Sequence, residues 1–113
     1  MTEPISLWLL TAHMLGDFPF QPQWMSEMKI DEVGTRFIHC SIHAFLFVPI
    51  AWVALIGVSQ LVFVGWIFAS HFIIDSRRWV EPKEGWGERW VWLMDQIMHL
   101  TALSLSLPVA GLF

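Results

Sequence analysis

Charged residues are scarce in this sequence, and its longest apolar stretches have no lysine, arginine or glutamate. Only 14% of the 113 residues are charged, whereas 56% are hydrophobic. A soluble domain of this size carries about 25% charged residues. Apolar stretches of about 20 residues with so little charge are typical of membrane-spanning helices. The composition therefore argues against a soluble protein.

Other absences exclude several kinds of site. The single cysteine, Cys40, cannot form an internal disulfide, and the sequence offers no thiolate metal site. It also has no glycine-rich phosphate loop, no nucleophile elbow and no CxxC pair. A net charge of −4 without a basic patch argues against a nucleic-acid partner. The first apolar run lacks a positively charged leader, so we expect it to be retained as a helix.

The apolar runs predict an all-α fold, a four-helix transmembrane bundle that forms a single domain over residues 1–113. The predicted helices span about residues 4–20, 35–58, 61–79 and 88–113. Residues 21–34 are polar and contain a proline, so we expect an interfacial segment on the membrane surface. Pro49 predicts a bend in the second helix. The short connection around residues 57–60 predicts that the second and third helices form an antiparallel hairpin.

The basic residues predict the orientation of the bundle, because they lie in or beside the first and third connections. They are Lys29, Arg36, Arg77, Arg78, Lys83 and Arg89. By the positive-inside rule, these connections face the cytoplasm, and both termini lie on the non-cytoplasmic side of a bacterial-type inner membrane. Membrane lipid is then a partner. Four short helices bury little surface, so we also expect a homo-oligomer or a larger membrane assembly.

Four pairs of ionisable residues, one in each predicted helix, are the main functional signal. The pairs are His13 with Asp17, His39 with His43, His71 with Asp75, and Asp95 with His99. They include all five histidines and three of the four aspartates of the chain. A spacing of four residues places both side chains on one helix face. With the predicted orientation, all eight side chains fall within roughly the inner 15 Å of the membrane.

These eight residues are the predicted metal ligands, because ionisable groups inside a membrane face the bundle interior and find partners there. Five imidazoles and three carboxylates are enough ligands to hold one or two divalent ions. The ligand set suits zinc best, with manganese or iron as alternatives. A bound ion would activate water, and Asp17 or Asp75 would be the catalytic general base. The sequence favours a metal-dependent hydrolase acting on a phosphoester or ester of a lipid-like or membrane-proximal substrate.

Other interpretations of the same residues stay open. Buried histidines and aspartates can serve only as hydrogen bonds between helices. Histidines on facing helices can bind haem, although the aspartates would then have no role. A row of such residues can also conduct ions or protons. The protein would then be non-enzymatic: a transporter, a metal-stabilised scaffold or a partner-binding subunit of a larger membrane assembly.

Some residues near the pairs have candidate supporting roles. Gln21 and Gln96 could orient the ligands from outside. Gly16 could allow two helices to approach closely. Three basic residues stand at the predicted cytoplasmic mouth, where they could bind a phosphate group or only fix the topology. They are Lys29, Arg77 and Arg78.

The motifs of the chain also resemble a known family. The opening motif is His13-Met-Leu-Gly16-Asp17-Phe18, followed by Gln21, Trp24, Met25 and Lys29. The later motifs are His39 with His43, His71 to Asp75, and Asp95-Gln96 with His99. In this order they resemble DUF3307 (domain of unknown function 3307), a family of bacterial and phage membrane proteins, and the resemblance covers most of the chain. In architecture alone, the chain is also similar to small membrane-bound metal-dependent hydrolases, which favours hydrolysis.

Overall fold

The computed structural model describes residues 2–17, 23–29, 32–76 and 88–113, and the regular structure within these ranges is helical. The helices are α1 (Thr2–Asp17), α2 (Gln23–Met28), α3 (Val33–Leu46), α4 (Val48–Ala54), α5 (Val58–Asp75) and α6 (Glu88–Ala110). The all-α prediction is confirmed. Parts of the predicted first helix (18–20), third helix (77–79) and interfacial segment (21–22 and 30–31) lie outside the described residues.

The predicted second helix is two helices, α3 and α4, which meet at Phe47. Pro49 sits in the first turn of α4, where its missing N–H costs no helical hydrogen bond. Its ring would clash with the carbonyl of residue 45 in a continuous helix, so the helix breaks just before it. The Phe47 amide donates to the Ala44 carbonyl at 3.0 Å, which tightens the last turn of α3.

A tight connection of three residues, 55–57, joins α4 to α5, and the predicted antiparallel hairpin is present. Gly57 has a φ of 66°, a conformation that glycine adopts without steric cost. We expected Ser59 and Gln60 in this connection, but both lie in the first turn of α5. Their side chains bind the connection instead. Ser59 Oγ donates to the Ile56 carbonyl at 2.7 Å, and Gln60 Nε2 donates to the Leu55 carbonyl at 2.8 Å.

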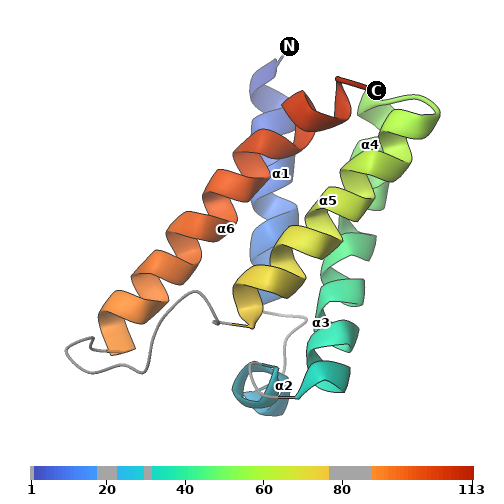
Figure 1. The fold of residues 1–113 in the computed structure, drawn as a ribbon. Helices are drawn as coiled ribbons and strands as arrows, with labels where there is room; N and C mark the ends of the chain where they lie inside the picture. Colours follow the sequence, from blue (N-terminus) through green and yellow to red (C-terminus); the bar gives the residue numbers. More distant parts are fainter. Residues whose placement is uncertain (1, 18–22, 30–31, 77–87) are drawn as a thin grey trace.

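The helices pack around α5, which contacts α3, α4 and α6, while α1 packs against α3 and α4. Figure 1 shows both termini at the same end of the molecule as the α4–α5 connection, with α2 at the opposite end. Near the termini, buried side chains form an apolar core. This apolar core consists of Leu9, Ala12, Ala44, Phe47, Ala51, Phe63, Ile67, Leu103 and Ala110. The opposite half of the helices holds the polar residues described below.

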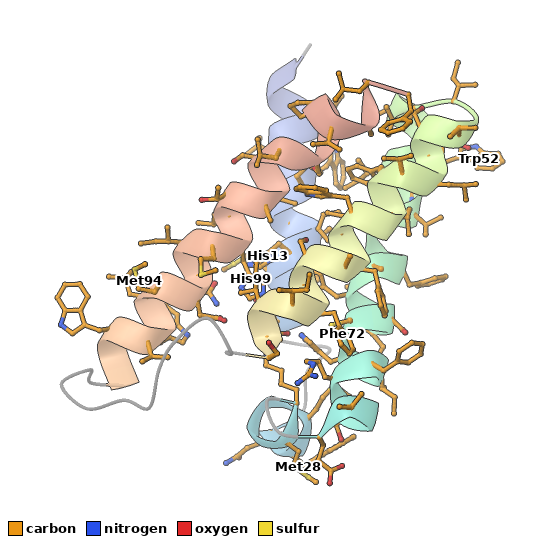
Figure 2. The ribbon with its side chains drawn as sticks, in the orientation of Figure 1. His13, Met28, Trp52, Phe72, Met94 and His99 are labelled. Carbon is orange, nitrogen blue, oxygen red and sulfur yellow. The ribbon has the colours of Figure 1, made fainter. Side chains whose placement is uncertain are left out.

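Two helical stretches are long and apolar enough to cross a membrane: Val33–Ala54, with a mean hydropathy of 1.8, and Val58–Asp75, with a mean hydropathy of 1.5. In the most apolar 18-residue window of each stretch, 33% of the first and 28% of the second is buried inside the protein. Large apolar side chains face outward on both, including Trp52 at 78% exposed and Leu61 at 76%. Figure 2 shows Trp52 directed away from the neighbouring helices. Length and composition thus support membrane insertion.

Candidate metal centre

The structure brings all eight predicted ligands together in one buried cluster between α1, α3, α5 and α6. They are His13, Asp17, His39, His43, His71, Asp75, Asp95 and His99, each at most 8% exposed. We call this set the polar cluster. His13 and His99 come from α1 and α6, yet their rings lie 5.6 Å apart, and Figure 2 shows them side by side.

The spacing of four residues explains how each helix presents its pair. In three helices the histidine nitrogen touches the carboxylate of its own pair. The distances are 3.3 Å for His13–Asp17, 3.2 Å for His71–Asp75 and 3.4 Å for His99–Asp95. In α3 the rings of His39 and His43 are 5.9 Å apart. Each helix therefore contributes two side chains to the same polar face, and no loop geometry is needed to place them.

His71 is at the centre of the polar cluster. Its ring stacks on that of His43 at 3.8 Å between centroids and lies 4.3 Å from the ring of His99. Its Nε2 atom lies 2.9 Å from His39 Nε2, 3.2 Å from Asp75 Oδ2 and 3.6 Å from Asp17 Oδ1. A single ring nitrogen therefore faces another imidazole and two carboxylates.

One set of ligand atoms has the spacing of a tetrahedral metal site. Asp17, His39, His43 and His71, here called the four-ligand group, present atoms within 4.8 Å of one another. Asp17 Oδ1 lies 3.7 Å from His39 Nε2, 3.7 Å from His43 Nδ1 and 3.6 Å from His71 Nε2. Ligands about 2.0–2.2 Å from a tetrahedral zinc ion lie roughly 3.4 Å apart. Three imidazoles and one carboxylate therefore fit one such ion.

Unsatisfied polar atoms in the polar cluster agree with that fit. The buried atoms His43 Nδ1, His39 Nδ1 and both carboxylate oxygens of Asp75 have no hydrogen-bond partner among the described residues. Most buried polar side-chain atoms in proteins do have a partner. His39 and His71 can share one hydrogen bond through their Nε2 atoms, but the other buried atoms converge without one, as ligands to a cation do.

A second group, formed by His71, Asp75 and His99, adjoins the first and shares His71 with it. His99 Nδ1 lies 2.8 Å from the Asp95 carbonyl oxygen, which can only accept, so Nδ1 is the donor. In a neutral ring, Nε2 then carries the lone pair. That atom faces Asp75 Oδ1 at 3.3 Å. Two acceptors at this distance need a proton or a cation between them.

His13 and Asp95 lie beside these two groups rather than within them. His13 contacts the second oxygen of Asp17, and Asp95 binds the ring of His99 through its backbone carbonyl. Gln96 Nε2 donates to Asp95 Oδ2 at 3.3 Å, which agrees with the orienting role expected for this glutamine. Gln21, the other expected orienting residue, lies outside the described residues.

Two cations, Lys29 and Arg36, reach the polar cluster from the α2 side. The Nζ atom of Lys29 lies 3.4 Å from Asp75 Oδ2, and the residue is only 8% exposed. Arg36 is buried as well; its Nη1 donates to the Lys29 carbonyl at 3.3 Å, and its guanidinium lies 4.5 Å from the centre of the Phe72 ring. The sequence placed Lys29 only at the mouth and gave Arg36 no role beyond topology. Arg77 and Arg78 are not among the described residues.

Gly16 allows α1 to approach α3 at the polar cluster. A Cβ atom at this position would overlap His43 Nδ1. The close approach expected from the sequence is therefore present, and its partner is a ring of the four-ligand group. Any side chain at position 16 must displace His43.

The family of the chain follows from a comparison of the whole sequence. The model of the family described as "Protein of unknown function (DUF3307)" matches residues 5–109. The chain belongs to the DUF3307 family. The match includes all eight residues of the polar cluster. No curated protein and no solved structure matches the chain.

A pocket in this DUF3307 protein adjoins the polar cluster and has two kinds of wall. Its polar lining comes from His13, His43, Ser70, His71 and His99. Its apolar lining comes from Phe47, Ile67 and Leu103, which belong to the apolar core. The pocket has room for about one water molecule, which would contact the imidazoles on one side and the apolar core on the other.

Proposed function

We propose that this DUF3307 protein is a four-helix transmembrane bundle, with spans formed by α1, α3 together with α4, α5 and α6. The 18 residues of α5 extend about 27 Å and the 23 residues of α6 about 34 Å, against a hydrocarbon thickness of about 30 Å. Exposed apolar side chains on α4 and α5 would contact lipid. With the basic connections in the cytoplasm of a bacterial-type cell, the membrane would be the inner membrane and both termini would be non-cytoplasmic.

We further propose that the polar cluster binds a divalent metal ion, with zinc preferred, and that the protein is a metal-dependent hydrolase. One observation carries this proposal: ligand atoms from three helices lie within 4.8 Å of one another, and distances of 2.9–3.7 Å among them are near the roughly 3.4 Å between ligands of a tetrahedral zinc ion. Hydrogen-bonded helix contacts alone would not leave His43 Nδ1 without a hydrogen bond. When bound, the ion would supply Lewis-acid activation of water.

Residues beside the four-ligand group would supply the general base and hold it in position. Asp17 belongs to the four-ligand group, so Asp75 is the better general base. Asp75 Oδ1 faces His99 Nε2, and the Asp95 carbonyl fixes the ring of His99. In this arrangement Asp75 would take a proton from the attacking water, and His99 would hold the carboxylate in place.

The proposed membrane setting supports the class of substrate. The pocket beside the imidazoles has room for about one water molecule, so it would hold the attacking water rather than the substrate. A lipid-like substrate would reach the polar cluster from the membrane itself. The activity proposed is therefore hydrolysis of a phosphoester or ester in an amphiphilic molecule.

A proton path is the second candidate function. Buried contacts of 3.3–3.4 Å link Asp95 to His99, His99 to Asp75, and Asp75 to Lys29, and such rows can carry protons. This alternative needs no metal, so metal content separates the two candidates.

The test is the metal content of the full chain purified in detergent. We expect about one or more equivalents of bound metal in the wild type, and loss of that metal in His71→Ala and in His43→Ala. The matched control is Cys40→Ala, because Cys40 is buried on α3 beside His39 but belongs to neither ligand group. A folded wild type without metal would contradict the proposal.

A further inference from the structure

We propose that the polar cluster holds one divalent ion, bound by the four-ligand group, and that Lys29 takes the place of a second ion beside Asp75. This inference rests on the proposed metal binding. It goes further because it assigns a role to Lys29 and divides the polar cluster into a metal half and a metal-free half.

His71 limits the number of ions that the polar cluster can hold. The two candidate ligand groups share this residue, and the same atom, Nε2, faces Asp17 in one group and Asp75 in the other. A ring nitrogen has one lone pair and can bind one ion. Once His71 binds within the four-ligand group, the second group keeps only Asp75 and His99. With two protein ligands, this group would hold a second ion more weakly than the three ligands of catalytic zinc sites normally do.

The positive charge beside Asp75 also opposes a second ion. The Lys29 ammonium lies 3.4 Å from Asp75 Oδ2 and is nearly enclosed, so it already neutralises this carboxylate. A divalent ion on the same carboxylate would be repelled by the ammonium, and burial would strengthen that repulsion. Lys29 is also held in place, because Arg36 binds its carbonyl oxygen from α3.

Position supports the same division. Lys29 directly follows α2, and α2 lies across the end of the bundle opposite to the termini (Figure 1). The pocket lies on the other side of the ligands, toward the apolar core. Lys29 therefore closes the α2 side of the polar cluster as a positioning residue, and the pocket lies on the opposite side.

The experiment counts metal ions per chain in wild type, Lys29→Met, Lys29→Arg and Asp75→Asn, each dialysed against excess zinc and then against buffer. We expect one ion in wild type and in Lys29→Arg, because arginine keeps the positive charge. Lys29→Met should take up a second, weaker ion during the zinc step, and the double variant Lys29→Met/Asp75→Asn should return to one. Two ions in wild type, or one ion in Lys29→Met throughout, would overturn the inference.

Asp75→Asn decides the question if Lys29→Met does not fold. We expect this variant to keep its single ion, with an affinity within about threefold of wild type, because Asp75 is not a ligand. Loss of the ion in Asp75→Asn would overturn the inference. No ion in the wild type is a different result, and it would contradict the proposed metal binding itself.

Discussion

The two halves of these helices are built differently although the same chain segments run through both. In the half near the termini, apolar side chains such as Phe47, Phe63 and Leu103 fill the space between helices. In the other half, imidazoles and carboxylates occupy the equivalent space, and several of their buried atoms have no hydrogen bond. Packing alone can hold the first half together. The second half needs a positive charge to offset its converging acceptors, which makes it the half that can bind a ligand.

The comparison predicts that the two halves respond to different perturbations. Substitutions in the apolar core should lower stability and leave metal binding in place. Substitutions in the polar cluster should change stability mainly because they weaken or remove the bound ion. The following predictions test this separation, and each uses the full chain in detergent.

Phe63→Ala should have the largest effect on stability. Phe63 is fully buried in the apolar core, and its ring contacts that of Phe47 with centroids 6.2 Å apart. Truncation leaves a cavity and should lower the free energy of unfolding by about 3–5 kcal/mol. Chemical denaturation gives this value, and metal analysis of the folded fraction should give the wild-type content. Loss of metal in parallel with stability would show that the halves are not separate.

Metal removal should have the next largest effect. If the ion is present at about 1,000 times its dissociation constant, it contributes roughly 4 kcal/mol to stability. A chelator should therefore lower the thermal midpoint, and added zinc should restore it. The matched control is His71→Ala, whose midpoint should not respond to chelator. An equal response in both proteins would be evidence against the polar cluster as the binding site.

Gly16→Ala should act on the four-ligand group without removing a ligand. The added methyl overlaps His43 Nδ1, so His43 must move, at a cost of about 1–3 kcal/mol. Metal affinity should fall with it, which a competition titration against a chromogenic chelator can measure. Gly65→Ala on α5 is the control, because nothing lies within 4 Å of the added atom. Equal metal affinity in Gly16→Ala and wild type would contradict the assignment of His43 as a metal ligand.

Trp66→Phe should have the smallest effect. The indole Nε1 donates to the Ala102 carbonyl on α6 at 2.8 Å, which links two helices. Its loss should cost about 1 kcal/mol of stability and leave the metal content unchanged. Thermal unfolding of the two proteins side by side measures this difference. A loss of metal in Trp66→Phe would show that metal binding by the polar cluster depends on the α5–α6 contact.

The sequence predicted most of the polar cluster because its residues follow local rules. A pair such as His71 and Asp75 shares a helix face by spacing alone, and burial of the pairs follows from the cost of exposing them to lipid. The start of α6 was also predicted, because charged residues, a proline and two glycines precede it in the sequence; the predicted end at residue 113 was too late, since α6 ends at Ala110. Local patterns of this kind need no knowledge of tertiary contacts.

The parts that could not be predicted depend on contacts between distant segments. Lys29 looks like an ordinary surface charge until α2 docks on α3 and brings it to Asp75, 46 residues later in the chain. Ser59 and Gln60 look like turn residues because they are polar, although they fold into α5 and bind the turn with their side chains. The division of the polar cluster into two groups also depends on which atom of His71 faces which carboxylate, and spacing does not determine this.

X-ray absorption at the metal edge of the purified protein tests the central claim most directly. The account predicts an ion whose shell contains imidazole nitrogens, with a carboxylate oxygen in the same shell, at about 2.0–2.2 Å. The imidazole signal should disappear from the spectrum of His71→Ala. A wild-type protein without bound metal, or a metal whose shell contains no imidazole, would contradict it.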